Sequence, residues 1–223
     1  MCGRYTLHTP GETVAEIFDV TESVELAPRY NIAPTQEVAV VGLSHQGNRS
    51  LGFMRWGLIP SWAKDPSIGN RLINARSESA AEKPAFRSSF KKRRCLVPAD
   101  GFYEWKKVGD GKQPHYLRMK TGAPFAIAGL WARWHGGEGD PVQSCTLLTT
   151  TPNEVAGAIH DRMPVILPAA AYSSWLDPET PPEALQELLV PYPAEEMEAY
   201  PVHPMVGNPR NDTPKCIEPL PPR

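Results

Sequence analysis

Proline limits what this chain can fold into more than any other residue. The sequence has 25 prolines among 223 residues. Each proline lacks an amide N–H and fixes φ, so it interrupts helices and the inner strands of sheets. We therefore expect many loops and few long helices. With 41% hydrophobic residues the chain can still build a core, and a length of roughly 200–250 residues is common for one mixed or β-rich domain.

Strand patterns predominate early in the chain and helix patterns late. Apolar runs and alternation predict strands over 37–43, 50–58, 94–107 (two strands joined by a turn), 113–134 (a hairpin that turns at Thr121–Gly122) and 145–151. Helical spacing and proline positions predict helices over 13–20, 74–84, 151–159, 168–176 and 181–190. Because no regular βαβ alternation is visible, we expect an α+β fold around a largely antiparallel sheet.

The charge of the chain is close to neutral in total but unevenly distributed. Residues 49–107 carry 13 Lys or Arg and 5 Asp or Glu, a local charge of +8, whereas residues 150–223 carry 4 and 11, a local charge of −7. Aromatic residues alternate with the cations of the first segment, as in MRWGLIPSW and RSSFKKRR. Because aromatic faces stack on bases while cations bind phosphates, the pattern favours single-stranded nucleic acid as a partner. A solvated run of charges is the alternative for FKKRR.

Several classes of protein are not indicated. No stretch approaches the ~20 apolar residues of a membrane span, and the N-terminus lacks the layout of a signal peptide. The cysteines lie far apart and form no CxxC pair, so they predict neither a zinc site nor a disulfide framework. They are Cys2, Cys95, Cys145 and Cys216. We expect a cytoplasmic protein with no metal and no cofactor.

The opening stretch, MCGRYT, places a cysteine directly after the initiator methionine. A small second residue permits removal of that methionine, which would leave Cys2 with a thiol and a free α-amine. An α-amine has a reference pKa of about 8 and attacks an aldehyde to give a Schiff base. The thiol can then close on the imine carbon to form a thiazolidine, a step favoured because it is intramolecular. An incidental cysteine is the alternative at this position.

An aldehyde trap of this kind needs groups that move protons and place the sugar, and the chain offers three. Glu104 lies between two aromatic residues in GFYEWKK, where burial would raise the pKa of its carboxyl group, unless it faces outward and pairs with a neighbouring lysine. His160 in AIHDRMPVIL can titrate near neutral pH or be a core histidine. Asn74 in LINARSES can hold a substrate hydroxyl or a turn.

Nine motifs follow one another from residue 1 to residue 212: MCGRYT, RYNIAPTQ, WGLIPSWAKD, INARSES, RCLVPADGFYEWKK, FAIAGLW, LLTTTPN, IHDRMPVIL and VGNPRND. In these motifs the chain resembles the SRAP (SOS response-associated peptidase) family, DNA–protein cross-linking proteins that shield abasic sites. The resemblance implies one SRAP domain over residues 1–223 on a barrel-like, largely antiparallel sheet with peripheral helices. About ten C-terminal residues would form a tail.

The resemblance also implies a reaction and its residues. The family's mature N-terminal cysteine forms a thiazolidine with the ring-opened sugar of an abasic site in single-stranded DNA, and it falls on Cys2. The family's Asn falls on Asn74 and would orient the sugar. Its Glu falls on Glu104 and would move protons during imine formation and ring closure, while its His falls on His160 and would assist ring opening and reversal. Self-processing that exposes the cysteine and AP-lyase cleavage are further implied activities.

Four positions match residues that contact DNA in this family. Arg76 and Arg162 match phosphate-binding arginines, and Arg4 is expected to join them. Trp62 resembles an aromatic wedge that stacks on a base, although some relatives have two adjacent aromatics where Ala63 follows here. We expect a monomer that binds single-stranded DNA containing abasic sites, associates with the nucleoid on damaged DNA, and loses affinity as salt rises.

Two other functions fit part of the pattern. An N-terminal-nucleophile amidohydrolase would attack an amide with the Cys2 thiol, use the amine of the same residue as the base, and act without DNA. A non-covalent reader of damaged or modified DNA would need only a basic groove and would keep its function after a Cys2→Ala change. Neither alternative requires Asn74, Glu104 and His160 together in these motifs.

Overall fold

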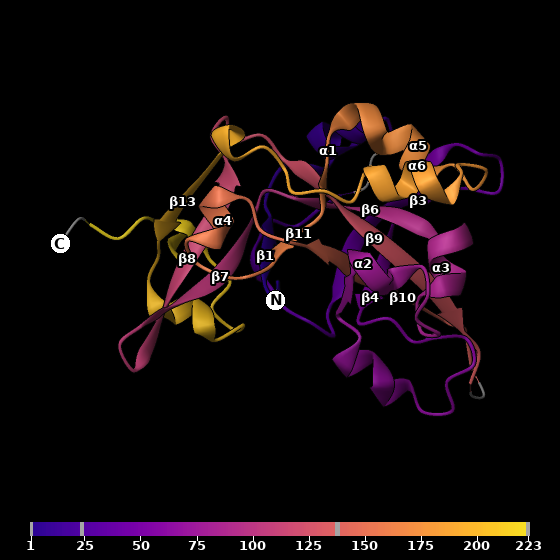
Figure 1. The fold of residues 1–223 in the computed structure, drawn as a ribbon, viewed down its shortest axis with the longest axis horizontal. Helices are drawn as coiled ribbons and strands as arrows, with labels where there is room; N and C mark the ends of the chain where they lie inside the picture. The colour runs from indigo at the N-terminus through magenta and orange to yellow at the C-terminus, as the bar shows by residue number, and fades with distance from the viewer. Residues whose placement is uncertain (1, 23–24, 137–138, 222–223) are drawn as a thin grey trace.

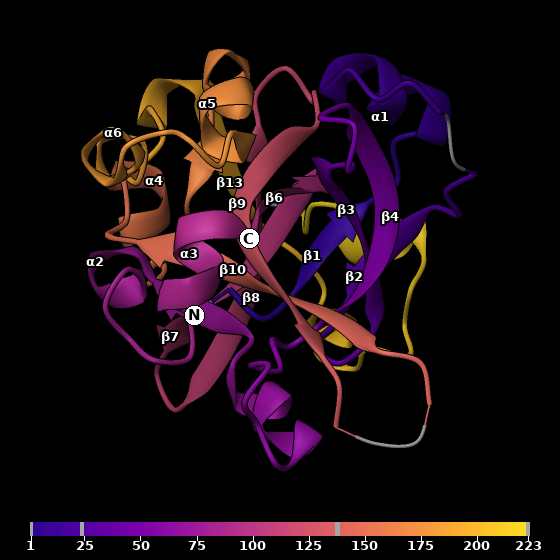
Figure 2. The same cartoon turned by 90° about the vertical axis from the view of Figure 1, so that its right-hand side faces the viewer.

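The computed structural model describes residues 2–22, 25–136 and 139–221. They form two β-sheets, and the helices lie on the outside of these sheets (Figure 1, Figure 2). The expected α+β class, with a barrel-like, largely antiparallel sheet and peripheral helices, is confirmed.

One sheet contains a closed barrel of five strands. β4 pairs with β3, β3 with β6, β6 with β9, β9 with β10, and β10 returns to β4. All of these pairs are antiparallel except the closing pair of β10 and β4, which is parallel. The barrel strands are β3 (Glu37–Leu43), β4 (Arg49–Trp56), β6 (Arg94–Ala99), β9 (Phe125–Trp134) and β10 (Val142–Thr150). Three short strands extend the sheet at β9 and β10: β5 (Asn74–Arg76), β11 (Met163–Pro164) and β12 (Ile166–Leu167).

The second sheet has five strands in the order β13–β8–β7–β1–β2. Its members are β1 (Tyr5–Leu7), β2 (Arg29–Ile32), β7 (Gly101–Val108), β8 (Gly111–Met119) and β13 (Met197–Pro201). In Figure 1, β13, β8 and β7 lie on one side of the molecule, the barrel lies on the other, and β1 runs between them. The chain therefore starts at the junction of the two sheets.

The helices are short, as the proline content predicts. They are α1 (Gly11–Phe18), α2 (Ser77–Ala80), α3 (Arg87–Lys92), α4 (Glu154–Gly157), α5 (Tyr172–Leu176) and α6 (Pro182–Glu187). Asn153 caps α4 because its side chain accepts a hydrogen bond from the backbone N–H of Ala156 at 2.9 Å. Among the described residues, none of the helices combines the length and the apolar character that a membrane span requires.

Two of the sequence-based expectations about elements are wrong. The turn at Thr121–Gly122 exists, but it does not join a hairpin, because β8 pairs with β7 and β13 whereas β9 belongs to the barrel. The helix expected over 74–84 begins as a strand, β5, and is helical only over α2. Residues 74–76 are extended, despite the helical tendency of the sequence, because their backbone pairs with β10.

The core has two parts. A large cluster of buried apolar side chains fills the barrel and extends beneath α1 and α5. A small second cluster lies beneath β7 and β8: Tyr103, Tyr116, Val202, Val206 and Cys216. The segment expected as a tail therefore packs in part against the second sheet, where Cys216 is fully buried and the backbone N–H of Leu220 donates to the carbonyl of Pro201 at 2.9 Å.

Candidate functional site

Strand pairing brings the start of the chain to Glu104. β1 and β7 are antiparallel, with Tyr5 opposite Phe102, and the Tyr103 N–H donates to the Arg4 carbonyl at 2.9 Å. Continuing this register places the residues before Arg4 beside Glu104. Cys2 is fully buried there, and the carboxylate of Glu104 is close enough to contribute to the raised pKa of the Cys2 thiol, after burial as the larger cause.

Asn74 reaches Cys2 from the barrel. It lies on β5, where Leu147 of β10 is its parallel partner. Its side-chain Nδ2 donates a hydrogen bond to the Cys2 carbonyl at 2.7 Å. The Oδ1 of the same amide is buried and accepts no hydrogen bond from the described residues. Because buried acceptors are normally satisfied, an open one beside Cys2 is suited to a donor from a ligand.

His160 closes the other side of the site. It follows α4, and its Nε2 lies 3.9 Å from Oε2 of Glu104. Its Nδ1 lies 3.1 Å from the backbone N–H of Arg162 and 3.0 Å from Oδ1 of Asp161. A neutral ring accepts at Nδ1 from Arg162, which leaves the proton on Nε2 toward Glu104, whereas a protonated ring can donate to Asp161. The site therefore holds the imidazole in place in both charge states.

Burial tunes these groups toward proton exchange. Glu104 is 3% exposed, and burial raises the pKa of its carboxyl group to about 7, while the backbone N–H of Trp105 acts in the opposite direction. Burial also lowers the pKa of His160, and the adjacent Asp161 partly offsets that effect. The Cys2 thiol stays protonated at neutral pH because its pKa is raised. A carboxyl group that titrates near pH 7 is suited to both give and accept a proton in this site.

The raised pKa of Glu104 predicts a pH-dependent stability difference for Glu104→Gln. The carboxyl group ionises near 4.5 in the unfolded chain and near 7 in the folded protein, so between these values the folded state binds more protons and the native protein loses stability as pH rises. Gln cannot ionise, so the variant gains relative stability from pH 5 to pH 8, by about 2–3 kcal/mol. Urea unfolding at both pH values checks this, and a pH-independent difference would contradict the buried, ionisable carboxyl.

Two hollows are lined by residues that lie next to Cys2. A pocket of about 380 Å³ is lined by Glu104, Trp105, Lys112, His160 and Gly207. A second pocket of about 440 Å³ is lined by Trp62, Arg71, Leu72, Asn74, Arg76, Lys83, Pro84, Ala85 and Phe86. Asn74 lines the second pocket and bonds to Cys2, whose thiol is affected by Glu104 of the first. Each pocket therefore has one wall residue, Asn74 or Glu104, next to Cys2.

The four expected DNA-contacting residues separate into two kinds. Trp62, 59% exposed, and the exposed Arg76 line the pocket beside Asn74. Arg162 instead forms a two-pronged ion pair with Glu78 at 2.6 and 2.9 Å and donates to the Thr149 carbonyl at 2.6 Å.

Arg4 is likewise held by acceptors of the protein. Its guanidinium donates to Asn31 Oδ1 and to the Val206 carbonyl, both at 2.8 Å, and lies over the ring of Trp105. These contacts fix the loop that carries Gly207 at the edge of the pocket around Glu104. Arg4 and Arg162 thus shape the walls of the site, whereas Trp62 and Arg76 present free surfaces to solvent.

Sequence reasoning missed several residues of the site. Glu78 and Asp161 engage Arg162 and His160, and Lys112 reaches the pocket of Glu104 from β8. The motif IHDRMP contains Asp161, so its proximity to His160 was visible in the sequence. The position of Lys112 depends on the pairing of β7 with β8 and has no signal in a local motif.

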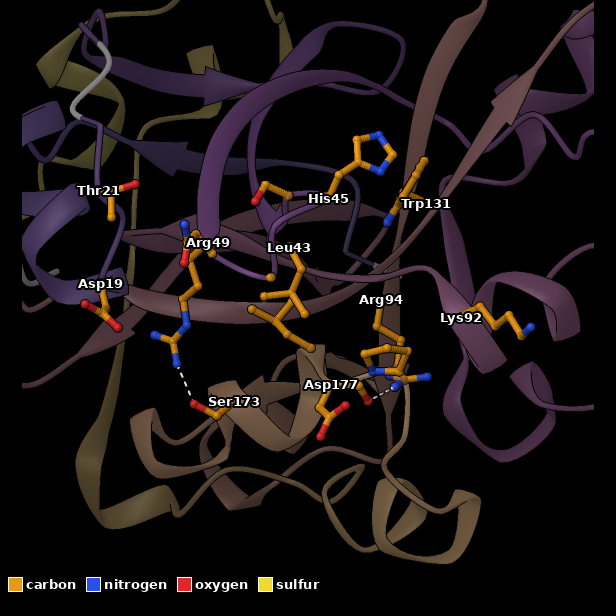
Figure 3. A pocket seen from close by; sticks show the side chains of 15 residues that line it. Asp19, Thr21, Leu43, His45, Arg49, Lys92, Arg94, Trp131, Ser173 and Asp177 are labelled. Atoms are coloured by element: carbon orange, nitrogen blue, oxygen red, sulfur yellow. Dashed lines mark hydrogen bonds between the residues drawn. The ribbon is translucent and has the colours of Figure 1, made fainter.

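A larger hollow lies elsewhere on the protein. It has a volume of about 900 Å³ between the β3–β4 turn and α5, and its lining includes none of Cys2, Asn74, Glu104 or His160. Figure 3 shows Arg49 directed toward Ser173 and Arg94 directed toward Asp177. Arg49 donates to Ser173 Oγ at 2.7 Å, and Arg94 donates to the Asp177 carbonyl, so both guanidinium groups are occupied by the protein. Within the described ranges, no cluster of His, Cys, Asp and Glu has the arrangement of a metal site.

Comparison with known families shows which family the chain belongs to. The family described as SOS response associated peptidase (SRAP) matches residues 1–209. The chain belongs to the SRAP family. The family expected from the motifs is therefore confirmed.

Relatives of this SRAP chain carry a common description. It is 45% identical over 223 residues to abasic site processing protein YoqW of Bacillus subtilis, which covers 98% of this chain and 99% of that protein. It is 35% identical to abasic site processing protein HMCES of Xenopus tropicalis, with 88% of this chain and 67% of that protein covered. A crystal structure of a Bacteroides thetaiotaomicron protein matches with a TM-score of 0.89 and 26% identity, covering 98% of this chain and 100% of that one. The fold and the family agree.

Proposed function

We propose that this SRAP protein processes abasic sites by capturing the sugar aldehyde in single-stranded DNA through Cys2. The observation that carries the proposal is the meeting of Cys2, Asn74, Glu104 and His160 from four separate segments at one place. The names of the relatives, which describe abasic site processing, support the same substrate. The proposed place of action is damaged DNA in the cytoplasm, where the protein would act as a monomer.

The reaction begins once Met1 is removed and Cys2 has a free α-amine. The amine attacks the aldehyde carbon of the ring-opened sugar to give a carbinolamine, and loss of its hydroxyl as water gives the imine. Glu104, with a pKa of about 7, is suited to protonate the departing hydroxyl. The proposal assigns this general-acid step to its carboxyl group.

Ring closure uses the thiol of the same residue. The sulfur bonds to the imine carbon, the thiol proton leaves to Glu104, and the imine nitrogen receives a proton, so the thiazolidine forms with one water lost overall. The Cys2 thiol is protonated before attack because its pKa is raised by burial. A base close to the thiol is therefore needed at the moment of S–C bond formation, and the ionised form of Glu104 supplies it.

Asn74 and His160 have separate tasks in this scheme. Asn74 fixes the Cys2 carbonyl through Nδ2, and its open Oδ1 is placed to accept a hydrogen bond from the amine or from a sugar hydroxyl. His160 lies at the mouth of the pocket with a partly exposed ring. We assign it the transfer of the proton that opens the sugar ring and, in reverse, the proton that reopens the thiazolidine.

Two further activities follow from the same intermediates as proposals. An imine whose thiol has not closed can undergo β-elimination, which is AP-lyase cleavage. Removal of the residue before Cys2 by the protein itself would be the self-processing that the family description suggests.

An SDS gel with labelled oligonucleotides tests the proposal. A band that survives denaturation is expected with single-stranded DNA carrying one abasic site, and none with the same undamaged strand. If a short amide substrate instead gave a burst of product while abasic DNA left no adduct, the amidohydrolase alternative would replace the proposal.

Trp62 and Arg76 provide a prediction on DNA affinity. Trp62→Ala removes a surface on which a base can stack, and stacking contributes about 1–3 kcal/mol per base. The affinity for single-stranded DNA should therefore fall by roughly five- to hundredfold with any sequence.

Arg76→Ala should weaken binding and lower the salt dependence, since one phosphate contact is lost. Fluorescence anisotropy over a salt series measures both, with Lys120→Ala, a surface lysine just beyond β8, as the control.

A further inference from the structure

The β7–β8 hairpin presents lysines at the edge of the site. Lys107 and Lys112 are direct partners in the antiparallel register, so their side chains emerge on the same face of the hairpin. Both are exposed, as is Lys106. The turn between the two strands carries one acidic residue, Asp110. Among the described residues, neither Lys107 nor Lys112 has a carboxylate, that of Asp110 included, within ion-pair distance.

Lys112 is the hairpin lysine that lies near Glu104 and His160. It lines the pocket of Glu104 and His160, and it also lines a neighbouring hollow of about 680 Å³ with Lys106, Gln113 and His115. Its charge is close enough to contribute to the lowered pKa of His160. The hairpin therefore continues the site on the side where Glu104 lies.

The other pocket beside Cys2 has a different lining. There, Asn74 opens into the pocket of Trp62 and Arg76. A strand that places its abasic sugar at Cys2 has one flank on each side of the lesion, and each flank carries phosphates. Like charges directly opposite one another in a sheet are unfavourable by themselves, and a phosphate between Lys107 and Lys112 would remove that repulsion.

We propose that the β7–β8 hairpin binds the phosphates of one flank of the lesion strand, with Lys112 as the main contact, while the pocket of Trp62 and Arg76 binds the other flank. This inference rests on the proposed function for the position of the lesion at Cys2. It assigns a DNA-binding role to Lys107 and Lys112, which share one face of the hairpin, and it makes the site two-armed. Lys112 lies outside the nine motifs.

Half-substrates test this division. The probes are single strands with a tetrahydrofuran abasic analogue, which has no aldehyde, at the 5′ end or at the 3′ end, so that each carries one flank. Lys112→Ala should weaken binding about tenfold for one of the two probes and leave the other unchanged. The slope of log affinity against log salt should fall by about 0.7 for the affected probe. Arg76→Ala should show the reverse preference.

Control variants make the result decisive. Lys112→Arg keeps the charge and should bind both probes like the unaltered protein, and Lys120→Ala should change neither. Equal weakening of both probes by Lys112→Ala, or no weakening of either, would overturn the proposal, since the lysines would then be general surface charges. These probes cannot cross-link, so they report binding alone. If the unaltered protein formed no adduct with true abasic DNA, but Lys112→Ala and Arg76→Ala still weakened different probes, the covalent function would be refuted and the two-armed binding would stand.

Discussion

Cys2→Ala is expected to abolish durable attachment to abasic DNA while leaving a trappable intermediate. Alanine is also small enough at position 2 for methionine removal, so the variant keeps an α-amine that can form the imine. It has no thiol to close the ring, and the imine hydrolyses in water. The account therefore predicts an adduct on a denaturing gel only when borohydride is added, whereas the unaltered protein gives the adduct without reduction.

The other cysteines provide the matched control for this experiment. Cys95, Cys145 and Cys216 are also buried free thiols. Their own backbone nitrogens are in peptide bonds, so none of them carries the free α-amine that the reaction needs. Replacing Cys216 with Ser or Ala should leave the adduct unchanged if the protein still folds, which circular dichroism can show. A Cys2→Ala protein that formed a stable adduct without borohydride would contradict the thiazolidine and leave a different nucleophile to be found.

Glu104→Gln is expected to slow cross-link formation by about 100-fold or more, the usual range for loss of a general acid–base group. Gln keeps the size of the side chain but can neither protonate the departing hydroxyl nor accept the thiol proton. In the unaltered protein, imine formation needs both the Glu104 acid, with a pKa of about 7, and the unprotonated amine, with a reference pKa of about 8. The rate should therefore pass through a maximum between these values and decline at higher pH. This decline should be absent from the residual rate of the variant.

His160→Ala separates the forward and reverse reactions. We expect it to slow release of the DNA from the purified adduct more than it slows adduct formation, because His160 is assigned to reopening of the ring. Quenched time courses in both directions measure the two rates for each variant. Equal loss of both rates in Glu104→Gln and His160→Ala would contradict this division of roles.

The sequence predicts the chemistry of the site better than its architecture. Cys2 and Glu104 are marked by residue type and by apolar neighbours, and burial raises the pKa of Glu104 as expected. The convergence of Asn74 on Cys2 depends on a three-residue strand, β5, which is too short to show a period of its own. The parallel pair of β10 and β4 that closes the barrel joins segments far apart in the chain, so local patterns carry no trace of it.

The incorrect hairpin at Thr121–Gly122 shows the same limit. β8 and β9 both have strand-like sequences, and the turn between them has the expected glycine with φ of 73°. Which sheet each strand enters is decided by burial of side chains against distant partners, not by the turn. The position of Lys112 follows from the observed strand pairing, because Lys112 lies beside Glu104 only when β8 pairs with β7.

Intact-mass spectrometry of the purified protein, before and after incubation with single-stranded DNA carrying one abasic site, tests the central claim most directly. The account predicts a protein that lacks Met1 and then gains the mass of the oligonucleotide less one water. A protein that retains Met1 has no free amine at Cys2, and a protein that lacks Met1 but gains no mass does not capture the aldehyde. Either result would contradict covalent capture through Cys2.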